Sequence, residues 1–227
     1  LRVIGNPAKH AHSYYRQGAD ELIYTDVVAS LYSRNSLHDV ISATAAKVFV
    51  PMTVGGGVRS TDDVESLLQV GADKVSLNTA AVANKDLITS IANKFGSQCC
   101  VLEVQAKQFG DDNWMVMVDN GREHTGLNVI SWVQQGVKMG AGEILLTSID
   151  RDGTRSGLDI NLIKKVTSTA SVPVIASGGV GRPEDVAEAL TSTRLHSIAI
   201  ADLFHYARAS IREVKLTIQE TGLRVRE

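Results

Sequence analysis

Two glycine-rich segments carry the clearest chemical signal in this sequence of 227 residues. Gly55-Gly56-Gly57 and Ser177-Gly178-Gly179 each follow a short apolar run and precede a helical pattern. Glycine permits positive φ angles and a close approach of the backbone to a ligand. Several backbone N–H groups beside a helix N-terminus can then converge on an anion. We interpret both segments as phosphate-binding loops, with tight turns that serve packing alone as the alternative.

The predicted strands that follow the two glycine segments also end in corresponding pairs of residues. Asn78 and Thr79 follow one such strand, and Ala201 and Asp202 follow the other. The hydroxyl and the amide of Thr79 can donate to a phosphate. Asp202 conflicts with a bound anion because like charges repel. Two alternatives therefore stay open: Asp202 points away and leaves its backbone N–H for phosphate, or the second loop binds another group.

Four further polar residues stand at the ends of predicted strands, namely Asp26, Gln105, Thr147 and Asp152. A carboxylate in such a position is a candidate general acid or base. As an alternative, Asp150, Arg151 and Asp152 could equally form a salt-bridged structural loop. We therefore take the four residues as candidates for a catalytic site.

Charged residues mark the opposite ends of three predicted strands. Glu21, Lys74 and Glu143 each stand at a strand start. Charges that point toward the axis of a barrel are costly unless they are paired. In a ring, these three side chains would pair with one another and narrow a passage along the barrel axis. The alternative is that they are ordinary surface charges.

The elements that must position these residues alternate between strands and helices. The predicted strands cover 22–26, 48–54, 73–77, 99–105, 142–147, 172–176 and 197–201. The predicted helices cover 8–17, 36–46, 61–69, 84–95, 128–138, 159–169, 183–191 and 207–221. Apolar strands alternating with helices indicate a parallel sheet covered by helices. Right-handed crossovers then favour an α/β TIM (βα)8 barrel.

The barrel is predicted to form one domain over 1–227, built from two half-barrels at about 1–122 and 123–227. The support is an internal repeat at an offset of 122 residues, which aligns 51–58 with 173–180. A complete barrel has eight strands, and the sequence offers seven. We expect the first strand to be absent from this chain, with a helix near 8–17 as the first element.

One segment interrupts the alternation. Residues 110–126 show alternating apolar residues and an Asn120-Gly121 turn, which predicts a hairpin. We expect this hairpin to be a surface elaboration without a chemical role.

Composition limits the classes of partner. The net charge of −2 argues against nucleic acid, which requires a basic patch. Apolar runs long enough to span a membrane are absent, as is a signal peptide, so we expect no membrane partner and a cytoplasmic location. The adjacent cysteines Cys99 and Cys100 are predicted to be reduced packing residues.

Several long strings resemble the cyclase subunit of imidazole glycerol phosphate synthase, a family of histidine biosynthesis. They are DELIYTDVVAS, TVGGGVRS, GADKVSLNTAAV, FGSQCCVLEVQAK, GAGEILLTSIDRDGTRSG, IASGGVG and LFHY. The resemblance covers essentially the whole chain. It implies a TIM barrel that needs no metal or organic cofactor. It also implies a heterodimer with a glutaminase subunit, from which ammonia crosses the barrel to a bis-phosphorylated ribulosyl-formimino carboxamide nucleotide.

By position, the resemblance implies roles for many of the residues above. It implies phosphate binding by Gly57, Asn78, Thr79, Gly153, Ser177, Gly178, Gly179, Ala201 and Asp202. It implies substrate contacts for Asp26, Thr147 and Asp152, an ammonia gate of Glu21, Lys74 and Glu143, and a glutaminase-facing surface that includes Asp73 and Gln98.

The sequence also departs from the family pattern. The family places a catalytic aspartate in a string that ends Asp-Ala-Lys, and here Gln105 stands at that position. Glutamine cannot transfer a proton as a carboxylate does. Besides the cyclase, two hypotheses therefore stay open: a paralogue that delivers ammonia to another acceptor, such as a surface-sugar amidation system, and a catalytically impaired fragment.

Overall fold

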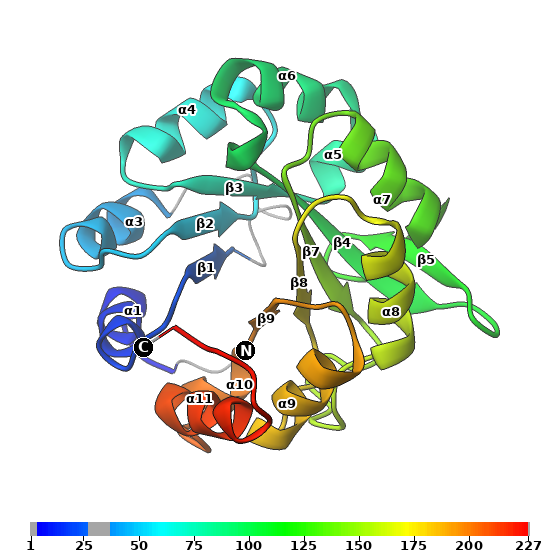
Figure 1. The fold of residues 1–227 in the computed structure, drawn as a ribbon. Helices are drawn as coiled ribbons and strands as arrows, with labels where there is room; N and C mark the ends of the chain where they lie inside the picture. The colour runs from blue at the N-terminus through cyan, green and yellow to red at the C-terminus, as the bar shows by residue number, and fades with distance from the viewer. Residues whose placement is uncertain (1–3, 27–36, 227) are drawn as a thin grey trace.

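Seven parallel strands form the central sheet of the computed structural model, which describes residues 4–26 and 37–226. They are β1 (Leu22–Thr25), β2 (Met52–Gly55), β3 (Lys74–Leu77), β4 (Cys100–Gln108), β7 (Glu143–Ser148), β8 (Val174–Ser177) and β9 (Ser197–Ala199). Each pairs in parallel with the next in that order. Figure 1 shows the strands as a ring surrounded by helices, so the predicted TIM barrel is confirmed.

The helices that cover the sheet follow the predicted pattern closely. They are α1 (Pro7–Arg16), α3 (His38–Ala45), α4 (Thr61–Gln69), α5 (Thr79–Ala83), α6 (Asp86–Phe95), α7 (Val129–Lys138), α8 (Ile160–Thr169), α9 (Pro183–Ser192), α10 (Asp202–His205) and α11 (Ile211–Glu220). A short 3-10 turn, η1 (Ser97–Cys99), precedes β4. None of the helices described in 4–26 and 37–226 has the length and apolar character needed to cross a membrane.

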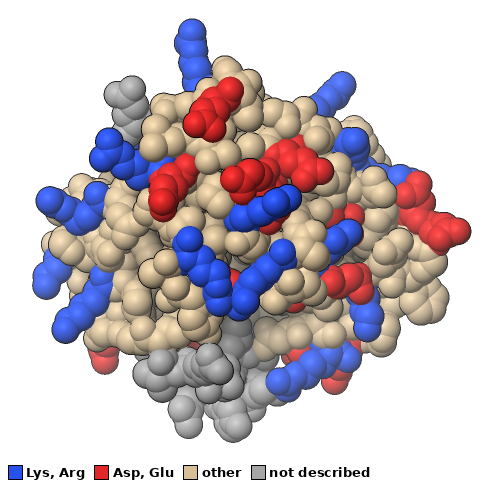
Figure 2. Space-filling view, turned by 90° about the horizontal axis from the view of Figure 1, so that it is seen from below, with Lys and Arg blue, Asp and Glu red and all other residues tan. Residues whose placement is uncertain are grey.

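The ring has a seam between β1 and β9, which are the two ends of the strand order over the described residues. Side chains connect the helices across this seam. Tyr14 Oη of α1 lies 2.7 Å from His205 Nδ1 of α10. Lys215 Nζ of α11 lies 3.0 Å from Asp20 Oδ1. Figure 2 views the molecule from the side of α10 and α11, where acidic and basic side chains are intermixed.

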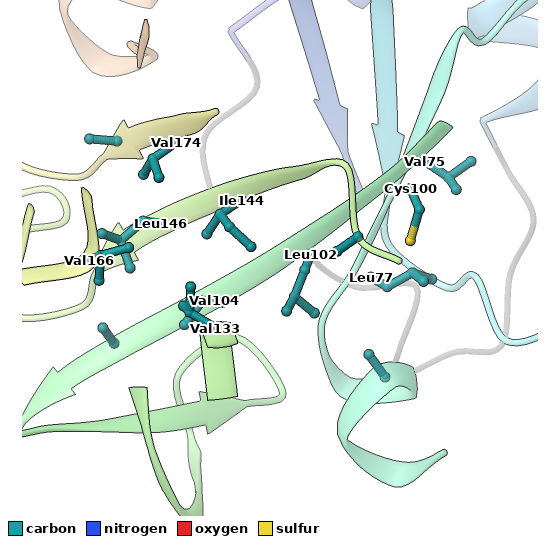
Figure 3. Packing of buried hydrophobic residues seen from close by; sticks show 14 of the residues in the cluster. Val75, Leu77, Cys100, Leu102, Val104, Val133, Ile144, Leu146, Val166 and Val174 are labelled. Atoms are coloured by element: carbon teal, nitrogen blue, oxygen red, sulfur yellow. The ribbon is translucent and has the colours of Figure 1, made fainter. Parts of the chain in front are cut away.

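Alternate residues of each strand face opposite sides of the sheet. The outer side packs apolar residues such as Leu102, Val104 and Ile144 against helices, including Val133 of α7 (Figure 3). The inner side holds a small apolar cluster around Val101, Leu145 and Ile175. This alternation places Ser76, Glu103, Gln105 and Thr147 on the inner face as well. The interior of the barrel is therefore partly polar.

Both cysteines are free thiols, as expected. Cys100 is fully buried on the outer face of β4. Burial raises its pKa to about 12, with a smaller contribution from the neighbouring Cys99. Cys100 therefore stays protonated and serves in packing.

The predicted hairpin forms from β5 (Trp114–Val118) and β6 (Glu123–Asn128). β5 pairs antiparallel with the end of β4. The expectation of a surface elaboration was wrong, because Trp114, Val116, Met117 and Val118 are all buried. The apolar side chains of β5 extend the core beyond the barrel, and α7 packs against the hairpin.

Candidate active site

The two glycine loops lie at the C-terminal ends of β2 and β8, the end of a TIM barrel at which active sites form. Gly56 and Gly57 have φ angles of 91° and 78°, and Gly178 and Gly179 have 93° and 104°. A Cβ on Gly178 would lie 2.8 Å from the carbonyl oxygen of Ser148. A Cβ on Gly56 would meet the corresponding oxygen of Asp26. The repeat seen in the sequence is thus a repeat of backbone geometry, and glycine is required at these positions.

An aspartate fixes the far side of each loop. Asp63 Oδ2 accepts hydrogen bonds from the backbone N–H groups of Arg59 and Ser60, at 2.9 and 3.0 Å. Asp185 Oδ2 accepts equivalent bonds from Gly181 and Arg182, at 2.8 and 3.1 Å. These amides are already used, so a bound anion would have to use the amides nearer the strand ends. The repeat offset of 122 residues also relates Asp63 to Asp185, but the sequence did not predict this role.

The first loop has Asn78 and Thr79 beside it, at the start of α5. Asn78 Nδ2 donates to the carbonyl oxygen of Met117 at 3.2 Å. Thr79 Oγ1 accepts a hydrogen bond of 3.1 Å from the backbone N–H of Asp119. Both acceptor and donor belong to the β5–β6 hairpin. The hairpin therefore orients the two residues that were predicted to bind phosphate.

Two arginines surround Asp202 at the second loop. Arg155 Nε and Nη2 donate to the two carboxylate oxygens at 2.8 and 3.2 Å. Arg208 Nη1 lies 2.6 Å from Asp202 Oδ2. The hydrogen bond from Arg155, with further attraction from both guanidinium groups, lowers the pKa of Asp202 against a smaller effect of burial. Two positive charges beside one negative charge leave a net positive site. Sequence analysis missed both arginines, because only the fold brings them to Asp202.

The loop after β7 is held by hydrogen bonds rather than by ion pairs among its own residues. Asp150 Oδ2 accepts from the backbone N–H of Gln108 at 2.7 Å. Arg151 Nη1 donates to the carbonyl oxygen and hydroxyl of Ser156, both at 3.2 Å. Asp152 and Gly153 are exposed at the tip of the loop, and Gly153 has a φ angle of 73°. Asp150 and Arg151 therefore have a structural role, whereas Asp152 is exposed.

Three predicted residues lie together on the inner face at the C-terminal end. Gln105, Thr147 and Ser177 are register partners on β4, β7 and β8. Asp26 directly follows β1, and its backbone N–H donates to the carbonyl oxygen of Gly55 at 3.0 Å. Ala201 is exposed at the N-cap of α10. Residues from both halves of the chain thus surround one end of the barrel.

At the opposite end of the barrel, the three predicted charges form one cluster. Lys74 Nζ lies 3.0 Å from Glu21 Oε2 and 2.6 Å from Glu143 Oε1. The Lys74 side chain is only 13% exposed. Burial lowers the pKa of Lys74, but the hydrogen bonds to Glu143 and Glu21 outweigh burial and raise the pKa above its ordinary value. The alternative of ordinary surface charge does not fit this geometry.

Comparison with known proteins identifies the family. The family model for histidine biosynthesis proteins matches residues 1–210. A Legionella pneumophila protein named imidazole glycerol phosphate synthase subunit HisF is 60% identical over 82% of this chain and 87% of its own length. The HisF subunits of Streptococcus mutans and Bacillus cereus are each 44% identical over 100% of this chain and 90% of their own lengths. The chain belongs to the HisF family.

Gln105 is the departure from the HisF pattern that the sequence singled out. In the described part of the chain its side chain forms no hydrogen bond with Thr147 or Ser177. Instead, its Nε2 donates to Glu103 Oε1 at 2.9 Å, one inward-facing position deeper in the barrel. Gln105 is 8% exposed. Sequence analysis did not single out Glu103, although its alternation with Val101 and Gln105 already places it on the inner face.

The residues expected to face the partner of a HisF subunit lie at the N-terminal end of the barrel. Asp73 and Gln98 are both exposed there. Asp73 Oδ2 accepts from the backbone N–H of Met52 at 2.8 Å, and Gln98 Nε2 donates to the carbonyl oxygen of Phe95 at 3.3 Å. Phe49, just before β2, is 76% exposed. Sequence analysis placed Phe49 inside a strand and therefore missed it as a surface residue.

Proposed function

We propose that this chain is the cyclase of a two-subunit imidazole glycerol phosphate synthase in the cytoplasm. It would use ammonia from a glutaminase subunit to convert a bis-phosphorylated ribulosyl-formimino carboxamide nucleotide. The products would be imidazole glycerol phosphate and aminoimidazole carboxamide ribotide. The observation that carries the proposal is the pair of matching glycine loops at one end of the barrel, because a substrate with two phosphates needs two such loops.

In this proposal each loop and its neighbours bind one phosphate. Gly57, Asn78 and Thr79 bind the first. The second is bound by Gly153, Ser177, Gly178, Gly179 and the Ala201-Asp202 pair, where Arg155 and Arg208 offset the carboxylate. An anion beside a net positive site is favourable at the low local dielectric of a binding site. Asp202 then acts through its backbone and through the arginines that it orients.

Proton transfer in this proposal falls to the carboxylates at the C-terminal end. Asp26 and Asp152 are the candidate acid and base, and Thr147 positions the substrate through its hydroxyl. Gln105 occupies the position of the family's aspartate but cannot exchange a proton. Loss of one such group typically lowers a rate by about 10²–10⁴-fold.

Ammonia would enter from the other end of the barrel. Lys74, Glu21 and Glu143 would form the gate, because their ion pairs would narrow the passage along the barrel axis at the N-terminal face. The glutaminase would dock on the exposed surface around Asp73 and Gln98. Phe49 adds an apolar anchor to that surface, since large exposed aromatic side chains are enriched at interfaces.

The test is to mix the chain with the bis-phosphate nucleotide and an ammonium salt, and to follow the loss of substrate absorbance. Turnover, and faster glutamine-dependent turnover with a glutaminase present, is the expected result. Tight nucleotide binding and stimulation of the glutaminase without turnover would favour the second candidate, an ammonia-delivering paralogue, which Gln105 supports. Failure to bind either partner would leave an impaired fragment.

A further inference from the structure

Glu103 is a buried carboxyl group in the centre of the barrel to which the proposed reaction gives no role. It lies on the inner face of β4, is 9% exposed, and pairs in register with the apolar Leu145 of β7. Burial raises its pKa, against the opposing effects of hydrogen bonds from Gln105 and Ser76. A buried carboxylate is costly unless it is paired or hydrogen-bonded.

The described neighbours of Glu103 are neutral donors. Gln105 Nε2 donates to Oε1 at 2.9 Å, and Ser76 Oγ donates to Oε2 at 3.5 Å. Within residues 4–26 and 37–226, no lysine, arginine or histidine forms an ion pair with it. A carboxylate can accept about four hydrogen bonds. It therefore has acceptor capacity left for a small cationic donor.

The amide oxygen of Gln105 supplies a second, independent observation. Gln105 Oε1 is buried and has no hydrogen-bond partner in the described part of the chain. It belongs to the same amide group whose nitrogen donates to Glu103, so it lies beside the carboxylate. A buried acceptor without a partner is destabilising, because the hydrogen bonds it made to water are not replaced. A ligand that carries several N–H groups would satisfy both acceptors.

The position of Glu103 connects the two ends of the barrel. Ser76 stands two residues beyond Lys74 on β3 and faces the same side of the sheet. Because Ser76 donates to Glu103, Glu103 lies one inward-facing position closer to the C-terminal end than the Lys74 ion pairs. Gln105 is the next inward-facing residue of β4 toward the C-terminal end. Two further buried acceptors without partners among the described residues, Thr53 Oγ1 and Glu143 Oε2, belong to inward-facing residues at the N-terminal side.

We propose that Glu103 and Gln105 form an ammonium-binding site inside the barrel, between the Lys74 ion pairs and the C-terminal end. Arriving ammonia takes the proton of the neutral Glu103 carboxyl group and is held as ammonium by the resulting carboxylate and by Gln105 Oε1. The proton then returns to Glu103, and ammonia leaves toward the C-terminal end with its lone pair free to attack. This inference deepens the proposed function and rests on it for the source of ammonia.

Binding can be tested without turnover. The chain is labelled with ¹³C at glutamate Cδ, and the Glu103 resonance is assigned from its loss in Glu103→Gln. Ammonium chloride is expected to shift this resonance saturably toward the carboxylate position, and tetramethylammonium chloride at equal ionic strength is not. An equal response to both salts, or no response, would overturn the site. An equal response to potassium chloride would also overturn it, because potassium donates no hydrogen bonds.

The second test uses turnover with a glutaminase. Glu103→Gln keeps the shape of the side chain but cannot return a proton, and we expect glutamine-dependent turnover to fall at least tenfold with unchanged nucleotide affinity. Glu103→Asp should recover part of the rate. The control is Glu65→Gln, a half-exposed carboxylate on α4, which should leave the rate unchanged. Unchanged turnover in Glu103→Gln would refute the relay. If the wild-type chain shows no turnover at all, the proposed function fails, and the ¹³C titration still decides whether the site exists.

Discussion

Arg155 Nε lies 2.8 Å from Asp202 Oδ2, so a guanidinium group stands at the second glycine loop where the sequence alone presented a carboxylate. Of the two alternatives for Asp202, the pairing favours the one in which its side chain is turned to other groups. Arg155 itself has a φ angle of 59°, a left-handed conformation that is uncommon for a residue with a side chain. The structure around this pair holds Arg155 there.

The first prediction concerns charge at this loop. Asp202→Ser removes the only negative charge of the Arg155–Asp202–Arg208 cluster, so binding of the bis-phosphate nucleotide should tighten about threefold to tenfold, or about 0.6–1.4 kcal/mol. Arg155→Met should weaken it by a similar factor. Titration calorimetry at low salt measures both. Weaker binding by Asp202→Ser would mean that its main role is to orient Arg155. Glu65→Ser, on the outer helices, is the control and should not change affinity.

The second prediction concerns Lys74. Lys74→Met leaves Glu21 and Glu143 without their cation, and the free energy of unfolding should fall by about 1–3 kcal/mol, between the values for exposed and buried pairs. Urea unfolding provides the measurement. The matched control is Lys94→Met, which breaks a pair of similar length, 2.7 Å, between half-exposed side chains. A loss no larger than that of the control would contradict the structural importance of the cluster.

The cluster also has a defined pH dependence. The pKa of Lys74 is raised in the folded chain, so its stabilising contribution is fully present below the ordinary lysine value of about 10.4 and disappears as pH rises through the raised pKa. The stability difference between wild type and Lys74→Met should therefore persist from pH 7 to pH 10. A difference that vanishes near pH 9 would show that the ion pairs do not hold the proton on Lys74.

The third prediction compares two glycines with positive φ. Gly178→Ala places a Cβ 2.8 Å from the Ser148 carbonyl oxygen, whereas a Cβ on Gly153 meets no atom within 4 Å. Gly153→Ala should cost about 1 kcal/mol from left-handed strain alone. Gly178→Ala should cost about 1–3 kcal/mol more, because the backbone of two loops must shift. Thermal unfolding of the two variants gives the difference, and equal costs would show that the loops separate easily.

The fourth prediction follows from the raised pKa of Glu103. The folded state binds the proton more tightly than the unfolded state, so stability falls as pH rises from about 4 through the raised pKa. Glu103→Gln removes this dependence and should be more stable than wild type at pH 7, with the difference shrinking toward pH 4. Urea unfolding across this range measures it. Parallel pH profiles for wild type and Glu103→Gln would contradict a raised pKa, and Glu65→Gln should not reproduce the gain.

The sequence predicted the barrel strands and most helices well, because each apolar run and amphipathic stretch is a local pattern. It also predicted the matching glycine loops, since both the glycines and their repeat are visible in the residue order. The short helices α5 and α10 were missed because four or five residues hold too little periodicity.

Other parts of the site depend on contacts between distant segments. Arg155 and Asp202 are 47 residues apart, and no local pattern joins them. The hairpin was mistaken for a surface feature because alternation shows that one face is apolar but not what covers that face. Glu103 was missed because it sits within a buried strand, whereas its partner Gln105 stands at the predicted strand end and at a position where the family has an aspartate.

The seam between β1 and β9 has a consequence for the order of folding. Tyr14 and His205, which connect helices across it, are 191 residues apart in the chain, so their contact closes a very long loop. Closing such a loop costs conformational entropy, and this cost is offset only after the intervening strands have paired. The strands in the middle of the sheet should therefore pair first. The Tyr14–His205 contact should be among the last to form and the first to break under denaturant.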